Sequence, residues 1–169
     1  DCKHLIVVAE QGFGDTIQFC RLMTNLKELG IEASLFCQEQ LAPLLRNNNL
    51  IDNVLVSLTK SKENVLWCPL LSLPDRLNIM PNNIPLSCGY LDVNQENKKK
   101  WLNLLNKPDR HLLIGIHWQG NEKFEQKLYS RGRSMPYRDL KPLSNLKGVR
   151  FLSLQKGDEM GFRSLFCLN

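Results

Sequence analysis

Residues 12–16, with the sequence GFGDT, are the strongest candidate for a functional turn. They stand between a short apolar run at residues 5–9 and a stretch with helical periodicity. Glycine lets a chain turn tightly and lets a ligand approach the backbone, and the amides of a helix N-terminus then face that ligand. Asp15 would lie in the first helical turn, where the helix dipole favours a carboxylate, and it is a candidate for catalysis. The alternative, in which Asp15 only caps the helix, stays open.

Two further polar clusters follow apolar runs in the last third of the chain. Residues 115–121 (GIHWQGN) and residues 153–157 (SLQKG) both come where a strand is expected to end, and Arg133 and Ser134 stand between them. A guanidinium group with nearby hydroxyl and amide groups suits a diphosphate. The alternatives are a solvated basic loop and, for His117 on its apolar strand, a hydrogen-bonded place in the core.

The elements that must position these groups alternate between strand and helix patterns. Apolar runs predict strands at residues 5–9, 33–37, 54–56 and 65–67, and helical spacing predicts helices at residues 17–29 and 41–46. Gly30 stands where a helix commonly ends. Such alternation favours a parallel sheet with helices on both sides, in which ligands bind beyond the carboxyl ends of the strands.

A second unit is expected after Pro108. Residues 69–85 contain four prolines and predict a loop with one helical turn, and residues 95–107 predict a helix that Pro108 ends. Strands are then expected at residues 112–118 and 149–154, with a short helix at 137–146 and a polar loop at 119–134. The sequence therefore predicts an α/β fold with two domains, a Rossmann-like domain at 1–108 and an incomplete second one at 109–169.

Composition and charge narrow the classes of function. The 169 residues are 43% apolar and 23% charged, as in an ordinary globular protein, and no apolar run reaches the roughly 18 residues of a membrane span. Residues 1–109 carry a net charge of −1 and residues 110–169 one of +6. The basic part could bind nucleic acid, a phosphorylated small molecule or an anionic membrane surface. It contains no recognised nucleic-acid motif, so we expect no nucleic acid.

The six cysteines show no Cys-x-x-Cys pair and no nearby pair of histidines, which argues against a zinc site and favours a reduced, cytoplasmic protein. Cys20 and Cys37 fall in apolar patterns, where a free thiol behaves as a small hydrophobic group. A nicotinamide cofactor is not expected either. Ile17 replaces the third glycine of the dinucleotide-binding pattern, and no acid stands about 20 residues further on.

Five motifs occur in an order that resembles glycosyltransferase family 9, the heptosyltransferase-like group. They are residues 7–19 (VVAEQGFGDTIQF), 69–74 (PLLSLP), 115–121, 133–136 (RSMP) and 153–157. Within that group, the chain looks most like bacterial enzymes in which this domain follows tetratricopeptide repeats. The resemblance covers nearly the whole chain up to Gly157.

The resemblance implies a GT-B enzyme with two Rossmann-like domains across a cleft, inverting, needing no metal or other cofactor, and using a nucleotide-diphosphate sugar. It assigns the general base to Asp15 and a phosphate contact to Arg133, where heptosyltransferases proper usually have lysine. The acceptor-side loop is then Gly12, Gly14, Thr16 and Gln18. The donor side comprises Trp118, Asn121, Arg133, Ser134, Gln155 and Lys156.

The sequence departs from the family after residue 158, where the segment that completes the donor site is absent. We therefore expect a fragment of a glycosyltransferase that has little or no activity alone. Its partners would be a nucleotide sugar and a glycan, lipid-linked or protein acceptor, in the cytoplasm or at the inner face of the membrane. The alternative function is that of a non-catalytic remnant that binds a glycan or a protein.

Overall fold

The computed structural model describes residues 4–58, 65–86, 89–105, 111–120 and 134–155. The chain divides into two compact units, residues 1–106 and residues 107–169, which are described separately below. The predicted boundary at residue 108 lies outside the described residues.

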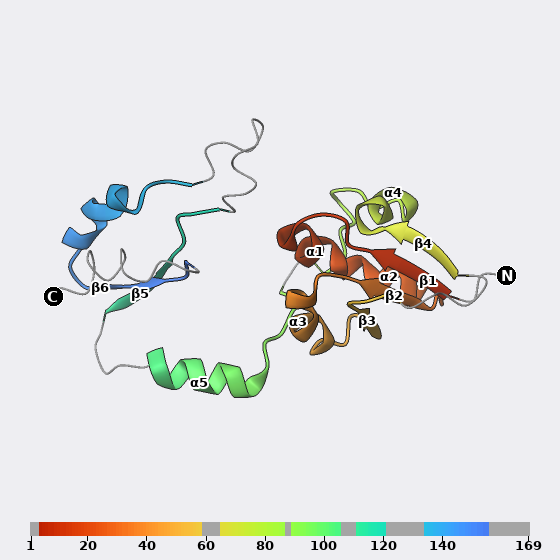
Figure 1. Cartoon of the computed structure of the whole chain (residues 1–169), viewed down its shortest axis with the longest axis horizontal. Coiled ribbons are helices and arrows are strands. Elements are labelled where there is room, and N and C mark those ends of the chain that lie inside the picture. The colour runs from red at the N-terminus through yellow and green to blue at the C-terminus, as the bar shows by residue number, and fades with distance from the viewer. Residues whose placement is uncertain (1–3, 59–64, 87–88, 106–110, 121–133, 156–169) are drawn as a thin grey trace. The chain divides into compact units, whose positions relative to one another are not determined.

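The first unit contains a parallel sheet of four strands in the order β3-β2-β1-β4 (Figure 1). Its strands are β1 (His4–Val8), β2 (Ala33–Phe36), β3 (Asn53–Leu55) and β4 (Val65–Pro69). All three pairings are parallel, and Val7 of the central strand β1 pairs with Leu35 on one side and Cys68 on the other. The predicted strands and their parallel arrangement are thus confirmed, with ends shifted by one or two residues.

The predicted helix at 17–29 consists of three short elements, α1 (Phe13–Phe19), the 3-10 turn η1 (Cys20–Leu22) and α2 (Met23–Glu28). The Thr24 hydroxyl donates to the Arg21 carbonyl three residues back, a bond that competes with regular helix bonding at this position. Gly30 follows α2 with a φ of +70°, the left-handed conformation that ends helices.

Short helices also follow β2 and β4, and a longer one precedes the second unit. They are η2 (Glu39–Leu41), α3 (Ala42–Arg46), η3 (Leu70–Ser72), α4 (Leu73–Arg76) and α5 (Gln95–Leu105). The predicted loop at 69–85 therefore contains slightly more helix than expected, because η3 and α4 follow each other directly.

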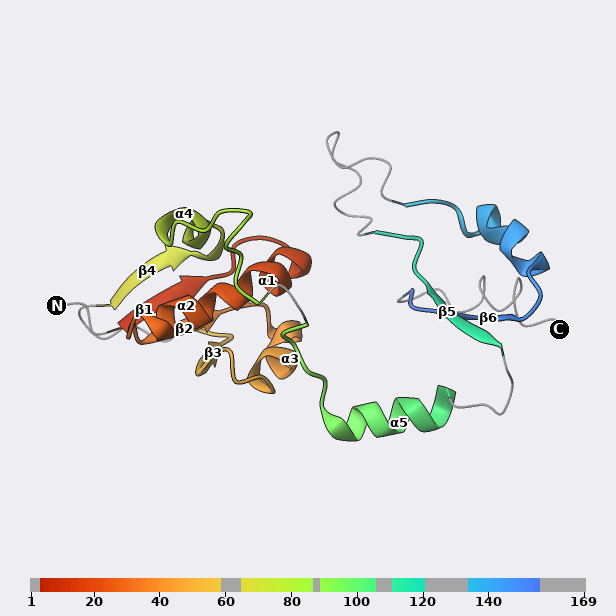
Figure 2. The ribbon, with the colours of Figure 1, turned by 180° about the vertical axis from the view of Figure 1, so that it is seen from behind.

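The core of the first unit lies on one face of the sheet. Paired residues in neighbouring parallel strands project to the same face, so Val7, Leu35 and Cys68 share one face with Leu5 and Val54. These residues pack with the buried side chains of η1, α2, α3 and α4, and Figures 1 and 2 show α1 and α2 on one side of the strands.

The opposite face carries Ile6, Val8, Phe36 and Leu55, which are half-buried, and Trp67, which is 69% exposed. None of these side chains belongs to the core cluster. The expectation of helices on both faces is therefore wrong for the described residues. The reason is that the described part of the connection between β3 and β4 contains no helix that could cover the second face.

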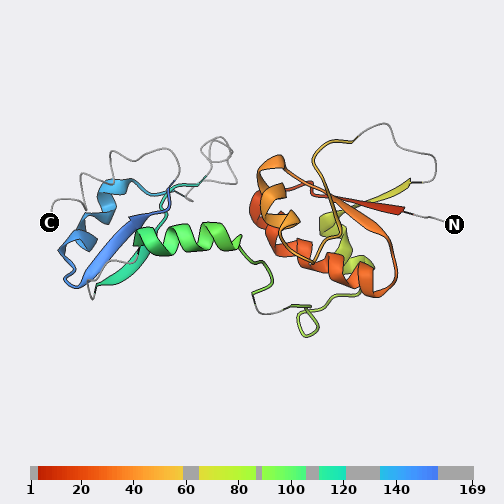
Figure 3. The same cartoon turned by 90° about the horizontal axis from the view of Figure 1, so that it is seen from below.

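The second unit contains two parallel strands, β5 (Leu112–Ile116) and β6 (Val149–Ser153), joined by η5 (Tyr137–Asn145). η5 is a 3-10 helix rather than the expected α-helix, and Pro142 inside it lacks the N–H group that an α-helix requires. Trp118 and Leu140 are the buried residues of a small core that Ile116, Leu143 and Phe151 complete. Figure 3 shows β5 and β6 side by side.

Candidate functional site

The turn after β1 places Asp15 at the third position of α1. Its Oδ2 accepts a hydrogen bond of 3.1 Å from the Gly12 N–H, which is one half of a capping box. The side chain is half-buried. The predicted cap is thus present, and it occupies one of the two carboxylate oxygens. Among the described residues Oδ1 has no such donor, so a substrate hydroxyl could still approach it.

Thr16 forms the floor of this turn. Its side chain is only 1% exposed, and Oγ1 donates to the Gly12 carbonyl at 3.2 Å and to Gln38 Oε1 at 3.0 Å. Gln38 in turn donates through Nε2 to the Gln11 carbonyl at 2.7 Å. Thr16 is therefore a positioning residue that ties the turn after β1 to the end of β2, and its hydroxyl is not exposed to a ligand.

Glycine at positions 12 and 14 is not required by the backbone. Gly12 has a φ of −71°, which any residue adopts, and Gly14 has no positive φ either. A Cβ at Gly14 would meet nothing within 4 Å, and one at Gly12 would only reach Asp15 Oδ2 at 3.4 Å. The tight-turn explanation is therefore wrong, and the close approach of a ligand to these glycines stays a prediction.

Glu10 joins the first two motifs of the resemblance. It lies two residues after the end of β1, and its carboxylate accepts hydrogen bonds from the N–H groups of Leu70, at 3.0 Å, and Leu71, at 3.3 Å. These residues begin η3 at the carboxyl end of β4, so the acid satisfies amides that a helix start leaves without partners. The PLLSLP motif is thereby fixed beside the GFGDT turn.

Arg21 anchors a later segment that the sequence did not single out. Its guanidinium donates to the Gln18 and Leu86 carbonyls and to the Tyr90 hydroxyl, and lies 4.2 Å from the centre of the Tyr90 ring. The Tyr90 hydroxyl donates to the Ile17 carbonyl at 2.6 Å. These bonds hold α1, which carries the exposed side chain of Gln18, to the segment that contains Leu86 and Tyr90. Arg21 is 65 residues from Leu86 and 69 residues from Tyr90 in the sequence, so no local sequence pattern could have predicted these contacts.

The turn after β5 is held by side chains from two other segments. Ser134 Oγ accepts the Gly120 N–H at 2.7 Å, and Gln155 Oε1 accepts the Gln119 N–H at 3.0 Å. The Met135 N–H donates to the Trp118 carbonyl at 3.0 Å. Three of the predicted donor-side residues, Trp118, Ser134 and Gln155, therefore come together at the carboxyl ends of β5 and β6.

The roles of these residues differ from what their types suggest. Trp118 is 6% exposed and packs in the core of the second unit, whereas His117 is exposed rather than buried as expected. The side-chain oxygens of Ser134 and Gln155 hold backbone amides of the turn. Asn121, Arg133 and Lys156, which the resemblance places on the donor side, lie outside the described residues.

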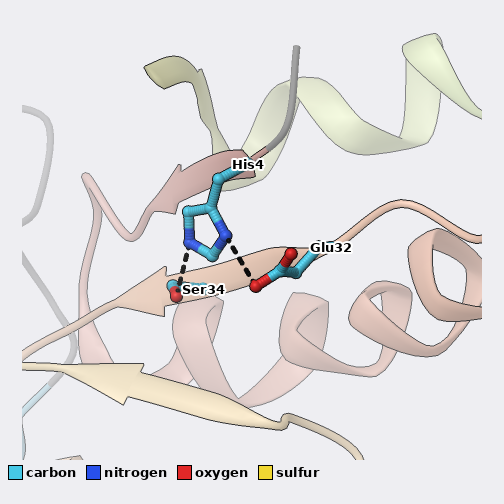
Figure 4. Close-up of polar contacts among 3 residues, drawn as sticks. All are labelled: His4, Glu32 and Ser34. Carbon is cyan, nitrogen blue, oxygen red and sulfur yellow. Dashed lines mark hydrogen bonds and ion pairs between the residues drawn. The ribbon is translucent and has the colours of Figure 1, made fainter. Parts of the chain in front are cut away.

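At the amino ends of β1 and β2, away from the turns described above, the side chain of His4 lies between those of Ser34 and Glu32 (Figure 4). His4 Nε2 is 2.9 Å from Ser34 Oγ, and Nδ1 is 3.4 Å from Glu32 Oε1. This arrangement has the order of a hydrolytic triad, but Ser34 is only 3% exposed, so no acyl group can reach it. It serves instead to join β1 to β2 on the face away from the core.

The described cysteines are free thiols. Cys20 and Cys37 are buried, as predicted, and Cys68 is half-buried. Burial raises the pKa of the Cys20 thiol to about 11, and burial also raises the pKa of Cys37 and of Cys68. These thiols are therefore poor nucleophiles.

The described residues include no group of three or more His, Cys, Asp or Glu that could hold a metal ion. In the same part of the chain, no helix has the length and apolarity needed to cross a membrane. Comparisons with models of known protein families, with curated proteins and with solved structures find no match to this chain.

Proposed function

We propose that the chain belongs to an inverting glycosyltransferase of family 9, with a GT-B architecture. The observation that carries the proposal is that the five motifs of the resemblance are joined by hydrogen bonds within each unit. Glu10 connects the first motif to the second, while Ser134 and Gln155 connect the fourth and fifth motifs to the third. Within each unit, the described residues of these motifs lie at the carboxyl ends of parallel strands, where α/β folds bind ligands.

In this proposal Asp15 takes the proton from the acceptor hydroxyl. General-base catalysis needs a carboxylate oxygen that is free to accept a proton, and the bond from the Gly12 N–H occupies only Oδ2. Positioning of the acceptor beside Asp15 supplies much of the rate acceleration in this scheme. The absence of a Cβ at Gly14 leaves room for the acceptor beside the turn.

The leaving diphosphate is assigned to the second unit. Transfer from a nucleotide-diphosphate sugar needs positive charge to stabilise the departing group. Residues 110–169 carry the net charge of +6, and Arg133 and Lys156 are adjacent in the sequence to Ser134 and Gln155, which hold the turn after β5. Ser134 and Gln155 would act by keeping that turn in shape. No metal is needed in this scheme.

The second candidate function is that of a binding module for a glycan or a protein. The cap formed by Asp15 favours it, because a carboxylate at this position has a structural role without any catalysis. The two functions differ in their need for a donor. A remnant would bind an acceptor without specific affinity for sugar nucleotides, whereas a transferase has to bind one.

Asp15 gives the sharpest test of transfer. In a preparation that turns over a sugar nucleotide, Asp15→Asn keeps an oxygen for the Gly12 N–H but removes the base. We expect transfer to fall by at least about 100-fold with donor affinity unchanged. Asp52→Asn, an exposed acid paired with Lys27, is the matched control and should transfer normally. Turnover retained by Asp15→Asn would refute the assigned base.

A further inference from the structure

Gln38, which the proposed function does not use, is bonded to both ends of the turn that carries Asp15. It lies two residues after the end of β2 and directly before η2, and its side chain is half-buried. Its Nε2 donates to the Gln11 carbonyl at 2.7 Å, and its Oε1 accepts the Thr16 hydroxyl at 3.0 Å. One amide group therefore bridges the residue before the turn and the residue after Asp15.

The turn has little other support from outside. Gly12 and Gly14 have no side chains, and glycine has the most conformational freedom to lose. The remaining hydrogen bonds of residues 11–16 are local ones, such as the two bonds between Gly12 and Thr16. Among the described residues, Gln38 is the only side chain from another part of the sequence that is hydrogen-bonded to this segment. The place of the turn relative to the end of β2 thus depends on Gln38.

The two bonds of Gln38 fall next to the residues that orient the carboxylate. Asp15 Oδ2 accepts the N–H of Gly12, which directly follows Gln11, and Asp15 itself directly precedes Thr16. The carboxylate is therefore bonded from inside the turn, while Gln38 holds the turn from outside.

We propose that Gln38 is a positioning residue for the proton transfer assigned to Asp15, an inference that rests on the proposed function. A general base has to lie within hydrogen-bond reach of the hydroxyl from which it takes the proton. A displacement of about 1 Å can cost up to about 100-fold in rate. By fixing both ends of the turn, Gln38 keeps the Asp15 carboxylate at the place where the acceptor hydroxyl has to bind.

The kinetic test is the substitution Gln38→Met, which keeps the length of the side chain and removes both polar groups. Because the diphosphate of the donor is assigned to the second unit, we expect kcat to fall at least about tenfold with the donor KM unchanged within about twofold. Gln40→Met is the matched control, because Gln40 is an exposed glutamine of η2, and it should transfer normally. An unchanged kcat in Gln38→Met, or a loss confined to the donor KM, would overturn the proposal.

A double-mutant cycle with Thr16 separates positioning from a general loss of activity. Thr16→Val removes the hydroxyl with almost no change of shape and should lower kcat as well, whereas Thr16→Ser keeps the hydroxyl and should restore transfer. Combining Gln38→Met with Thr16→Val should cost little more than the larger single effect, because both changes remove the same bond. Fully additive losses would assign the two residues separate roles and contradict the proposal.

Amide hydrogen exchange tests the same idea without any turnover. In Gln38→Met, exchange at the Gly12 and Thr16 N–H groups should accelerate at least about tenfold, while Val7 and Leu35 in the sheet keep their rates. Equal exchange at Gly12 and Thr16 in the wild type and Gln38→Met would overturn the proposal, and so would an equal acceleration at all four amides. If the turn alone exchanges faster but the wild-type protein turns over no sugar linked to UDP, GDP or ADP, the proposed function fails and the hold of Gln38 on the turn stands.

Discussion

The turn after β1 and the turn after β5 both lie at the carboxyl end of a parallel strand, but they are held in different ways. In the first, Asp15 accepts a hydrogen bond from the N–H of Gly12, three residues earlier, and the hydroxyl of the buried Thr16 donates to the Gly12 carbonyl. In the second, the amides of Gln119 and Gly120 depend on side chains 36 and 14 residues away. The first turn thus combines local bonds with contacts to Gln38, 22 and 27 residues away, whereas both of these side-chain bonds in the second turn are tertiary.

The two turns also rest on cores of different size. The first unit buries 13 residues in one cluster, whereas the described part of the second unit buries only Trp118 and Leu140. Since stability grows with buried apolar area, the described part of the second unit depends strongly on this pair and on its hydrogen bonds. The geometry of its turn should therefore be sensitive to single substitutions that the first unit tolerates.

The largest expected effect is that of Trp118→Ala. Truncating a buried tryptophan typically costs about 3–5 kcal/mol, which exceeds what so small a core can supply. Amide resonances of the second unit should collapse in a two-dimensional NMR spectrum, while those of the first unit stay dispersed. Trp67→Ala removes the same side chain from an exposed position and should leave both sets in place. Dispersed resonances for residues 111–120 in Trp118→Ala would show that this core is not what holds the unit.

Removing the Ser134 hydroxyl should have the next largest effect. Ser134→Ala leaves the Gly120 N–H without its acceptor, at a cost of about 1–3 kcal/mol because the bond is partly buried. Hydrogen exchange at Gly120 should accelerate by one to two orders of magnitude. Ser134→Thr retains an oxygen at the same place and should restore protection. Equal exchange in the wild type and Ser134→Ala would mean that the turn does not depend on this bond.

A smaller effect is expected in the first unit. Asp15→Ala removes the cap of α1 and should lower the free energy of unfolding by about 0.5–1 kcal/mol, measured by urea denaturation. Asp15→Asn should lower it less, because the amide oxygen can still accept the Gly12 N–H. A loss above 2 kcal/mol in Asp15→Asn would indicate that the ionised carboxylate has a structural role beyond the cap.

The smallest expected effect is a difference between the thiols in their rate of chemical labelling. With a pKa of about 11, the Cys20 thiol is ionised on the order of one part in a thousand at pH 8. Labelling by a thiol reagent should therefore be slowest at Cys20 and faster at the half-buried Cys68, as mass spectrometry of peptides can show. Labelling of native Cys20 at the rate of the unfolded chain would contradict its burial.

The strands of the first unit could be predicted because each is a short apolar run between polar turns, and their alternation with helices gave the parallel sheet. The break in the first helix could not, since it accompanies a side-chain bond of Thr24 that a periodic pattern does not reveal. The uncovered face of the sheet was missed for a similar reason. The alternation of strands and helices predicts that helices are present, but it does not predict which face of the sheet each helix covers.

The candidate site was predictable to the same extent. Local patterns identified Asp15 and the residues around it, because a glycine-rich turn between strand and helix has a recognisable spacing. Patterns also picked out Ser134 and Gln155, but as ligand contacts rather than as the acceptors that hold the turn after β5. The brace formed by Arg21 and Tyr90 has no local signature at all.

The central claim is that this chain binds a nucleotide-diphosphate sugar through its second unit. The direct measurement is an NMR titration of the chain with sugars linked to UDP, GDP and ADP, with a CMP-linked sugar as the control that lacks a diphosphate. We predict that one nucleotide-diphosphate sugar shifts the amides of Gln119, Gly120 and Gln155, and that Arg133→Ala weakens this binding at least about tenfold. No shift at these amides with any of the three donors, or equal shifts with the CMP-linked sugar, would contradict the account.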